Sequence, residues 1–483
     1  MTNDLYHSAF SRGPWSMKTE LTGNLIIGRY DVRGRGRLIH AVDPVGCMQL
    51  EPGYRSAGPE DAELACTLAQ GAALVASQVR LAQRADFMES VAYHMKRIEV
   101  QLAARMMLET GVTAERAAAE LSGLADEYRC IAAALRARFS MPTRLGLGTI
   151  VVFGSNRISM SVSVAGTFTL NALAAGCAVI AVADPGLPGI SELLGRALQA
   201  GIAETGLPDG VFSMLLGGDD TGIRALLSGH SISAIASPSP NHYATQAAAA
   251  RAGNSDIQVF LQEGDVNPVF ILPYALNARA ENIARKFAAQ ANDASGQLAS
   301  RATVLFAVDC EGFVDMREAL VDAICAATFG FLTPSAHADY MQSLTRFLVN
   351  GGVERIGEGE VACGTWAAQA VVFETDAATL LAQPRLAAGM SGPVALLVRC
   401  ATAEQLLEAA KELTGQAMVS IFADPEDADL DDLLCMIAGG EGTRIAHNDF
   451  AGAVDSKWRA SYAEGDGDAR YRMIQRFSKA LPL

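Results

Sequence analysis

From residue 148 onward, short apolar runs alternate with longer amphipathic stretches. The apolar runs predict buried strands, and they fall at 149–153, 178–183, 211–216 and 232–236. The stretches between them predict helices near 163–175, 189–203, 220–228 and 241–252. Strand–helix units repeated in this way predict a parallel sheet with helices on both faces. Such doubly wound sheets bind nucleotides at the carboxyl ends of their strands.

Further elements are expected on both sides of this run. Ahead of it, the pattern predicts short strands at 24–30 and 38–42, then helices from 59, near 86–109 and near 113–138. Beyond residue 257 a second alternation begins, with strands expected at 269–272, 304–308, 371–374 and 394–398, and the chain then returns through 419–422 and 443–446. A chain of 483 residues is too long for one core. The fold class is therefore α/β, with two doubly wound, Rossmann-like parallel-sheet domains.

Composition narrows the classes of partner. The formal net charge of −15 argues against nucleic acid and anionic membranes. The basic cluster Arg29, Arg33, Arg35 and Arg37 is interrupted by glycines, and we interpret it as a solvated turn. No signal peptide is evident at 1–16, and the apolar run 170–183 is too short to span a bilayer. Nine cysteines without a C-x-x-C pair predict reduced thiols in the cytoplasm, and the seven histidines show no metal-ligand spacing.

Several short sequence motifs, called phrases below, occur one after another along the chain. They are Val152-Phe153-Gly154-Ser155-Asn156, Ser163-Val164-Ala165-Gly166, Leu173-Ala174-Ala175-Gly176-Cys177, Gly206-Leu207-Pro208-Asp209-Gly210-Val211-Phe212, Asn267-Pro268-Val269-Phe270, Leu272-Pro273, Gly296-Gln297, Phe373-Glu374-Thr375-Asp376 and Gly392-Pro393. In this order they resemble the aldehyde dehydrogenase superfamily, and most closely its ketoglutarate-semialdehyde dehydrogenase-like members. Each phrase alone is a weak signal, but their collinearity is strong evidence for the fold.

The resemblance implies a known chemistry. In the family, a cysteine thiolate attacks the aldehyde, and a side-chain amide with a backbone N–H stabilises the oxyanion. Hydride then leaves to the nicotinamide, and a glutamate activates the water that hydrolyses the thioester. A lysine and a second glutamate hold the adenosine ribose, and a glycine-marked turn cradles the pyrophosphate.

Each of these positions holds a different residue type here. By the phrases, the nucleophile position is Ala299, the general-base position Gln262, the oxyanion asparagine Arg157, the ribose lysine Val182, and the second glutamate Gly389, with Ser391 in place of a phenylalanine. The glycine turn has become Ala236-Ser237-Pro238-Ser239-Pro240, whose prolines remove N–H donors. We therefore expect a degenerate site with no catalytic, cofactor-binding or metal residue intact. No cofactor is expected, and NAD(P) is expected only if the chain is a dehydrogenase after all.

Ser300 and Arg301 follow Ala299, the nucleophile position, and Glu263 follows Gln262, the general-base position. A shifted register makes Glu263 the base, but it restores no thiol, because Cys310 falls in or after the next strand. Ser300 has no adjacent base and is expected to satisfy its hydroxyl locally.

Arg157, directly after the first phrase, and Cys177, in the third, have more than a packing role to be considered. Arg157 is either a solvent-facing or ion-paired side chain, or a new anion contact. Cys177 sits in a packing phrase and is expected to be a small buried hydrophobe.

The resemblance also implies domain boundaries. Residues 1–255, completed by 436–470, are expected to form a nucleotide-binding-type domain, 256–435 a catalytic-type domain, and 471–483 a C-terminal interface strand. The connector 139–145 is short where the family usually has a hairpin arm, which predicts a reduced oligomerisation element. The tail strand then either folds back on its own subunit or pairs with another chain that still has the arm.

These positions predict a catalytically inactive family member. Its expected role is to bind or support a protein partner, such as an active aldehyde dehydrogenase paralogue or a pathway enzyme, because the apolar pattern of the core is intact. One alternative is an enzyme with new chemistry in the old cleft, using Arg157, Gln262, Glu263 and Ser300. The other is an ordinary NAD(P)-dependent semialdehyde dehydrogenase whose local alignment is misread here. Dinucleotide binding separates them, since only the dehydrogenase requires it.

Overall fold

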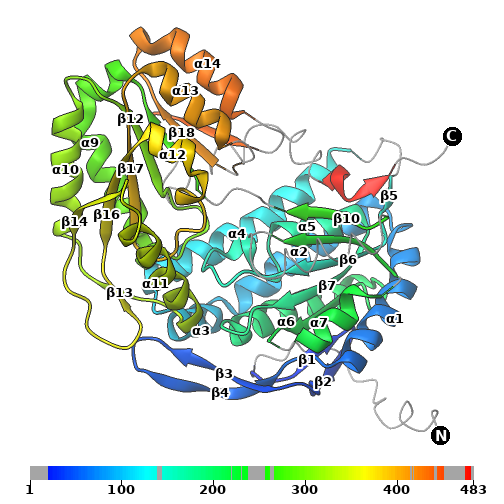
Figure 1. The fold of residues 1–483 in the computed structure, drawn as a ribbon. Helices are drawn as coiled ribbons and strands as arrows, with labels where there is room; N and C mark the ends of the chain where they lie inside the picture. Colours follow the sequence, from blue (N-terminus) through cyan, green and yellow to red (C-terminus); the bar gives the residue numbers. More distant parts are fainter. Residues whose placement is uncertain are drawn as a thin grey trace, which may run out of the picture.

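Two α/β domains, each built on a seven-stranded sheet, lie side by side (Figure 1). The computed structural model describes residues 20–138, 144–218, 220–229, 231–237, 256–261, 266–413, 416, 418–439, 443–450 and 474–479. The expected fold class, with two Rossmann-like parallel-sheet domains, is confirmed. Within these residues, no helix combines the length and the apolar character that crossing a membrane requires.

The first sheet has the order β10-β9-β6-β7-β8-β1-β2. Its first five strands are parallel, and β1 and β2 add an antiparallel edge. In chain order the strands are β1 (Leu25–Ile27), β2 (Tyr30–Val32), β6 (Thr149–Phe153), β7 (Ala178–Ala183), β8 (Phe212–Leu216), β9 (Ile232–Ser237) and β10 (Gln258–Leu261). Each residue of β6, β7 and β8 is buried, as a strand covered by helices on both faces requires.

Helices cover both faces of this sheet. On one face α1 packs with α7, and on the other α5 and α6 are covered in turn by α2, α3 and α4. Their bounds are α1 (Pro59–Ala76), α2 (Leu81–Arg97), α3 (Glu99–Thr110), α4 (Ala114–Arg136), α5 (Thr167–Ala175), α6 (Pro188–Thr205) and α7 (Asp220–Leu227). Gly111 ends the helical stretch before α4, with φ of 73°. That stretch is broken at Ile98 into two helices.

The second sheet has the order β14-β16-β17-β12-β11-β18-β19, and only β14 is antiparallel to its neighbour. Its strands are β11 (Val269–Ile271), β12 (Val304–Val308), β14 (Glu354–Glu358), β16 (Val371–Asp376), β17 (Val394–Cys400), β18 (Met418–Phe422) and β19 (Arg444–His447). Its helices are α9 (Pro273–Asn292), α10 (Phe313–Cys325), α11 (Pro334–Leu348), α12 (Ala377–Ala382), α13 (Ala403–Glu412) and α14 (Ala428–Ala438). Two separate apolar clusters fill its two faces, one under α9 and α10 and one under the remaining helices.

Three small sheets complete the described structure. The hairpin of β3 (Leu38–Asp43) and β4 (Met48–Arg55) runs along the lower edge of the molecule, beside α3 (Figure 1). β13 (Gly330–Phe331) pairs with β15 (Ala367–Ala368), and β5 (Leu145–Gly146) pairs with β20 (Ser478–Lys479).

Two strands lie in the other sheet from the one expected. The boundary after residue 255 places 258–261 in the second domain, but β10 pairs with β9 in the first sheet. The segment 436–470 was expected to complete the first domain, but β19 within it pairs with β18 in the second sheet. These two assignments are wrong, because local apolar pattern does not record which strand a segment pairs with. The helix expected near 241–252 lies outside the described residues.

The described part of the C-terminal tail docks on its own chain. Ser478 and Lys479 pair antiparallel with Gly146 and Leu145. Phe477 is buried, with its ring centroid 4.8 Å from that of Phe260, and its carbonyl accepts the Cys177 thiol at 3.2 Å. Cys177 is thus a buried packing residue, as expected, and it also anchors the tail. Of the two routes expected for the tail strand, residues 474–479 take the fold-back route.

Replacing Phe477 with alanine should destabilise the first domain by about 3–5 kcal/mol, because it leaves a cavity beside Phe260 and Phe168. Lys479→Ala, on the exposed side of the same strand, is the matched control and should change stability by less than about 0.5 kcal/mol. Urea denaturation followed by circular dichroism measures both. Equal midpoints for the two variants would show that the tail is not docked in solution.

Candidate functional site

The loop that carries Ala299 follows α9 as the short 3-10 turn η2 (Asp293–Gly296). Three successive residues there, Ala294, Ser295 and Gly296, have positive φ angles of 49°, 55° and 69°. The first two are strained for side chains of L residues. A Cβ on Gly296 would lie 2.2 Å from the carbonyl oxygen of Gly392. The loop is therefore pressed backbone to backbone against the segment before β17.

Two amides hold this loop in place. The Asn267 side-chain amide donates to the carbonyls of Ala299 and Arg301, both at 2.9 Å. The Gln297 amide donates to the carbonyl of Phe331 at 3.0 Å and accepts the backbone N–H of Thr333 at 3.3 Å. These bonds engage carbonyls and N–H groups, so they fix the backbone at residue 299 whatever its side chain is.

The turn after β6 carries Arg157 and lies against the same loop. The Ile158 N–H donates to the Gln297 carbonyl at 3.1 Å, which brings the nucleophile and oxyanion positions of the family together. Directly before Arg157, the Asn156 side-chain amide donates to Asp339 on α11 at 3.3 Å. Arg157 is partly buried, and its charge together with the Asn156 amide opposes the rise that burial gives the pKa of Asp339. Arg157 therefore lies near a carboxylate, as the ion-paired interpretation of it requires.

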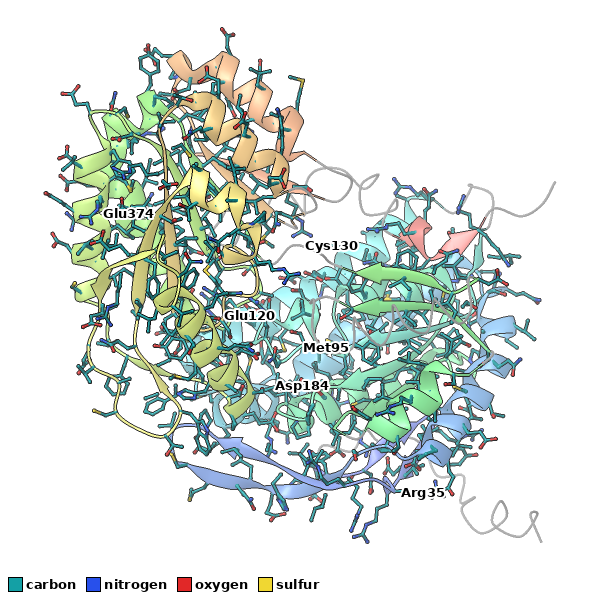
Figure 2. The ribbon with its side chains drawn as sticks, in the orientation of Figure 1. Arg35, Met95, Glu120, Cys130, Asp184 and Glu374 are labelled. Atoms are coloured by element: carbon teal, nitrogen blue, oxygen red, sulfur yellow. The ribbon has the colours of Figure 1, made fainter. Side chains whose placement is uncertain are left out.

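A network on α4 supports both segments. Arg116 forms an ion pair with Asp293, at the start of η2, and another with Glu120. Glu120 in turn accepts the Ser159 hydroxyl at 3.2 Å and the Met160 N–H at 3.1 Å. Figure 2 shows Glu120 where the two domains meet. The network is built from side chains that position the backbone of both segments.

Arg301 joins the loop to the segment that carries Gly389 and Ser391. Its side chain is fully buried and donates to the carbonyls of Met390 at 2.7 Å and Val394 at 3.2 Å. Although Arg301 lies beside the vacant position in sequence, its guanidinium points into the core and not into the cleft. Gly389 has φ of 64°, and the Ser391 hydroxyl donates to the Ala336 carbonyl at 3.4 Å.

The cofactor positions of the family lie at the carboxyl ends of β7 and β9. Val182 is 1% exposed, so an apolar side chain packed in the core stands where the family has a cation. Ala236 and Ser237 are fully buried at the end of β9. Five residues named for the site lie outside the described part of the chain and are not placed here: Pro238, Ser239, Pro240, Gln262 and Glu263.

Asp184, one residue beyond β7, is a site residue that sequence reasoning did not single out. It is partly buried and lies in the region between the domains (Figure 2). Burial raises its pKa to about 6, the nearby charge of Asp339 raises it further, and the hydrogen bond from the Gly186 N–H at 2.8 Å opposes the rise. Its signal in the sequence is weak, because a lone aspartate after a strand more often marks a turn.

Residues 34–424 match the aldehyde dehydrogenase family. The chain is 30% identical over 459 residues to alpha-ketoglutaric semialdehyde dehydrogenase 2 of Azospirillum brasilense, covering 90% of this chain and 87% of that protein. Its fold is similar to an NAD-dependent benzaldehyde dehydrogenase from Corynebacterium glutamicum, with a TM-score of 0.77, 15% identity, and 96% and 98% of the two chains covered. It is also similar to a cysteine-to-alanine mutant of aldehyde dehydrogenase C from Pseudomonas syringae in complex with NAD+ and octanal, with a TM-score of 0.74, 18% identity, and 88% and 89% covered.

Asp184→Asn should remove a pH dependence of stability. The folded-state pKa of Asp184 lies above its ordinary value of 3.8. The stability that this carboxyl group contributes is therefore fully present below pH 3.8 and is lost as pH rises through about 6. The difference between a pKa of 3.8 and one of about 6 corresponds to about 3 kcal/mol of unfolding free energy. The variant should therefore be more stable than the wild type by about 1–3 kcal/mol near neutral pH and equal to it in acid. Urea midpoints across pH measure this, with exposed Asp322→Asn as control. Destabilisation at neutral pH would show that the fold stabilises the Asp184 carboxylate and does not raise its pKa.

Arg301→Leu should destabilise the second domain by about 2–4 kcal/mol, because the carbonyls of Met390 and Val394 lose a buried donor. Ser300→Ala, at the neighbouring position, should stay within about 0.5 kcal/mol of the wild type. Chemical denaturation measures both variants. If Arg301→Leu is as stable as Ser300→Ala, the guanidinium does not hold these two segments together.

Proposed function

This chain belongs to the aldehyde dehydrogenase family, and we propose that it is a member that does not oxidise aldehydes through a thioester. In this proposal it acts by binding a protein partner, either an active aldehyde dehydrogenase or an enzyme of the same pathway. The proposal rests above all on one observation. The backbone around residue 299 is held by Asn267, Gln297 and the Gly296–Gly392 contact, and the side chain it presents is a methyl group.

A methyl group cannot attack a carbonyl carbon. In the described part of the chain, the contacts of Cys310, Cys177 and Cys400 place none of these thiols at residue 299. The loop 293–301 contains no cysteine. The nearest cysteine downstream, Cys310, donates to the Asn277 side chain at the far end of β12, and burial raises its pKa. Cys177 and Cys400 are buried in the cores of the two domains, and burial raises the pKa of each thiol, to about 11 and about 12.

Loss of cofactor binding is the second part of the proposal. Val182 offers a ribose no hydrogen bond and no charge, and the replaced glycine turn carries two prolines. The cysteine-to-alanine mutant from Pseudomonas syringae nevertheless binds NAD+ and octanal, so this fold can hold both ligands after losing a cysteine. Binding by this chain therefore has to be measured separately from turnover.

The second candidate function is an active NAD(P)-dependent semialdehyde dehydrogenase. It is favoured by the 30% identity to a protein of that name over 90% of the chain. Without a thiol, the hydrated aldehyde would have to give its hydride to NAD(P)+ directly, forming the carboxylic acid, NAD(P)H and a proton. Such a step needs a base near the hydrate, and Glu263 is the carboxylate that the sequence offers beside the general-base position.

The purified chain should form no NADH or NADPH from alpha-ketoglutaric semialdehyde or short aldehydes beyond a no-protein control. Ala299→Cys should stay inactive, because the base and the cofactor anchors are still absent. Absorbance of the reduced cofactor measures turnover, and calorimetry measures NAD+ binding. The Azospirillum brasilense relative, assayed in parallel, confirms that the substrate is competent.

The outcomes separate the two candidates. Turnover by the wild type overturns the inactive-member proposal, and loss of that turnover in Glu263→Gln assigns it to the hydrated-aldehyde route. Without turnover, co-expression with an active family member from the same source tests partner binding. A stable hetero-oligomer in light scattering supports the partner role, and separate elution of the two chains contradicts it.

A further inference from the structure

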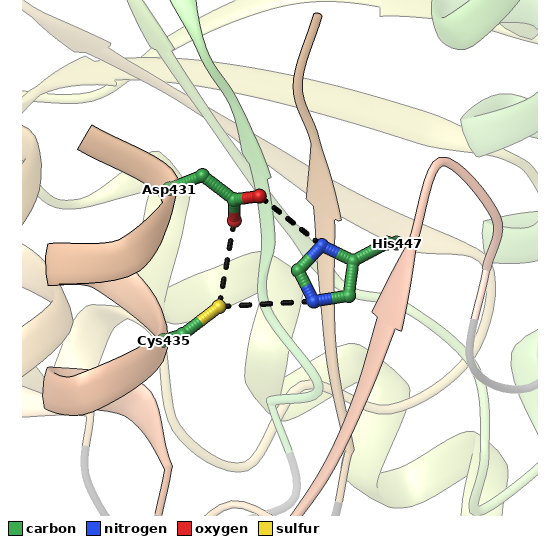
Figure 3. A group of neighbouring side chains, drawn as sticks. All are labelled: Asp431, Cys435 and His447. Atoms are coloured by element: carbon green, nitrogen blue, oxygen red, sulfur yellow. Dashed lines mark hydrogen bonds and ion pairs between the residues drawn. The ribbon is translucent and has the colours of Figure 1, made fainter. Parts of the chain in front are cut away.

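Three side chains with metal-binding chemistry converge at one edge of the second sheet (Figure 3). They are Asp431 and Cys435 on α14 and His447, the last residue of β19. One potential ligand atom from each lies within 4.8 Å of the others. The cluster is separate from the residues described for the candidate site, and it joins α14 to β19, the edge strand of the second sheet.

The fold brings these residues together for a simple reason. Asp431 and Cys435 are four residues apart, so they share one face of α14. The chain then turns back and adds β19 parallel to β18, with His447 opposite Ile421. This crossing places an imidazole from the strand next to the thiol from the helix.

Three short distances link the side chains. The Cys435 Sγ lies 3.4 Å from the Asp431 Oδ1 and 3.7 Å from the His447 Nε2. The other ring nitrogen of His447, Nδ1, lies 3.3 Å from the other carboxylate oxygen of Asp431, Oδ2. Ligands bound at about 2.0–2.3 Å in a tetrahedral zinc site lie about 3.3–3.6 Å from one another. The sulfur–oxygen and sulfur–nitrogen distances are close to that range already.

The charges around the thiol argue against a catalytic cysteine. A nucleophilic cysteine needs a lowered pKa, which an adjacent cation or helix N-terminus provides. Here the thiol donates to the carboxylate of Asp431, with Sγ 3.4 Å from Oδ1, and it lies near the C-terminal end of α14. A carboxylate beside a thiol is an unfavourable setting for a bare thiolate and a favourable one for a thiolate bound to a divalent cation.

We propose that Asp431, Cys435 and His447 bind a divalent transition metal of the zinc class. Thiolate, imidazole and carboxylate are the donors that Zn²⁺ takes in proteins, whereas Ca²⁺ and Mg²⁺ take oxygen ligands. Binding converts the Cys435 thiol to a metal thiolate and releases one proton to solvent. Three protein ligands leave a fourth position open to water or an external ligand, and the His447 side chain, 48% exposed, faces the approach from solvent.

Cobalt is the direct probe, because Co²⁺ bound to a thiolate gives a charge-transfer absorption in the near ultraviolet. Titration of the chelator-treated full chain with Co²⁺ alone should saturate this band at one equivalent, and Zn²⁺ should then abolish it. Cys435→Ser should abolish the band, and His447→Asn and Asp431→Asn should each weaken Co²⁺ binding by at least about tenfold. Cys363→Ser, at an exposed cysteine elsewhere in the second domain, is the matched control and should titrate like the wild type.

A measurement on the wild type alone guards against misfolded variants. Zn²⁺ should slow alkylation of Cys435 by iodoacetamide, followed by mass spectrometry, and should leave the exposed Cys47 and Cys363 unchanged. Equal protection of all three thiols, no thiolate band at one equivalent, or a band that persists in Cys435→Ser would each overturn the proposal. None of these outcomes depends on aldehyde turnover, so the metal site and the proposed function stand or fall separately.

Discussion

The close approach of Gly296 to Gly392 is the constraint on which the site region depends. Only a residue without a Cβ allows the loop after α9 to lie against the segment before β17. From that contact, Gln297 reaches two other segments: its side chain bonds Phe331 and Thr333, and its carbonyl accepts the Ile158 N–H. This short loop therefore links the two domains, and its backbone position is fixed by groups that do not include the side chain of residue 299.

This arrangement explains how a catalytic position can change without loss of the fold. Alanine and cysteine are similar in size, and the bonds that hold residue 299 end on its carbonyl. Val182 follows the same logic, because an apolar side chain at a position 1% exposed avoids the desolvation of a buried cation. Arg301 differs, since its guanidinium bonds two carbonyls in the core and its loss would leave them without a donor. Packing therefore constrains Arg301 strongly, favours an apolar side chain at residue 182, and constrains residue 299 weakly.

Much of the fold could be read from the sequence, and the exceptions have physical causes. The run 178–183 is recognisable because β7 is buried on both faces and has no polar residue. The sheets that contain β10 and β19 could not be read, because pairing partners are set by long-range packing. Arg301 lies two residues beyond Ala299, but proximity in sequence does not show where a side chain points. The Cys435–His447 pair was missed because the two residues come from a helix and a strand, with no local spacing to connect them.

The fold of the tail also changes the reasoning about assembly. An unpaired tail strand was the motive for a partner that supplies the missing hairpin arm. In the described residues, β20 has β5 as its mate, and Arg144 fixes it further by donating to the Ser478 hydroxyl at 2.8 Å and carbonyl at 3.1 Å. With Phe477 buried in the first domain, drawing this strand onto another chain would first require removing an aromatic side chain from a packed core. The docked tail therefore argues against β20 as the strand by which the proposed partner would bind.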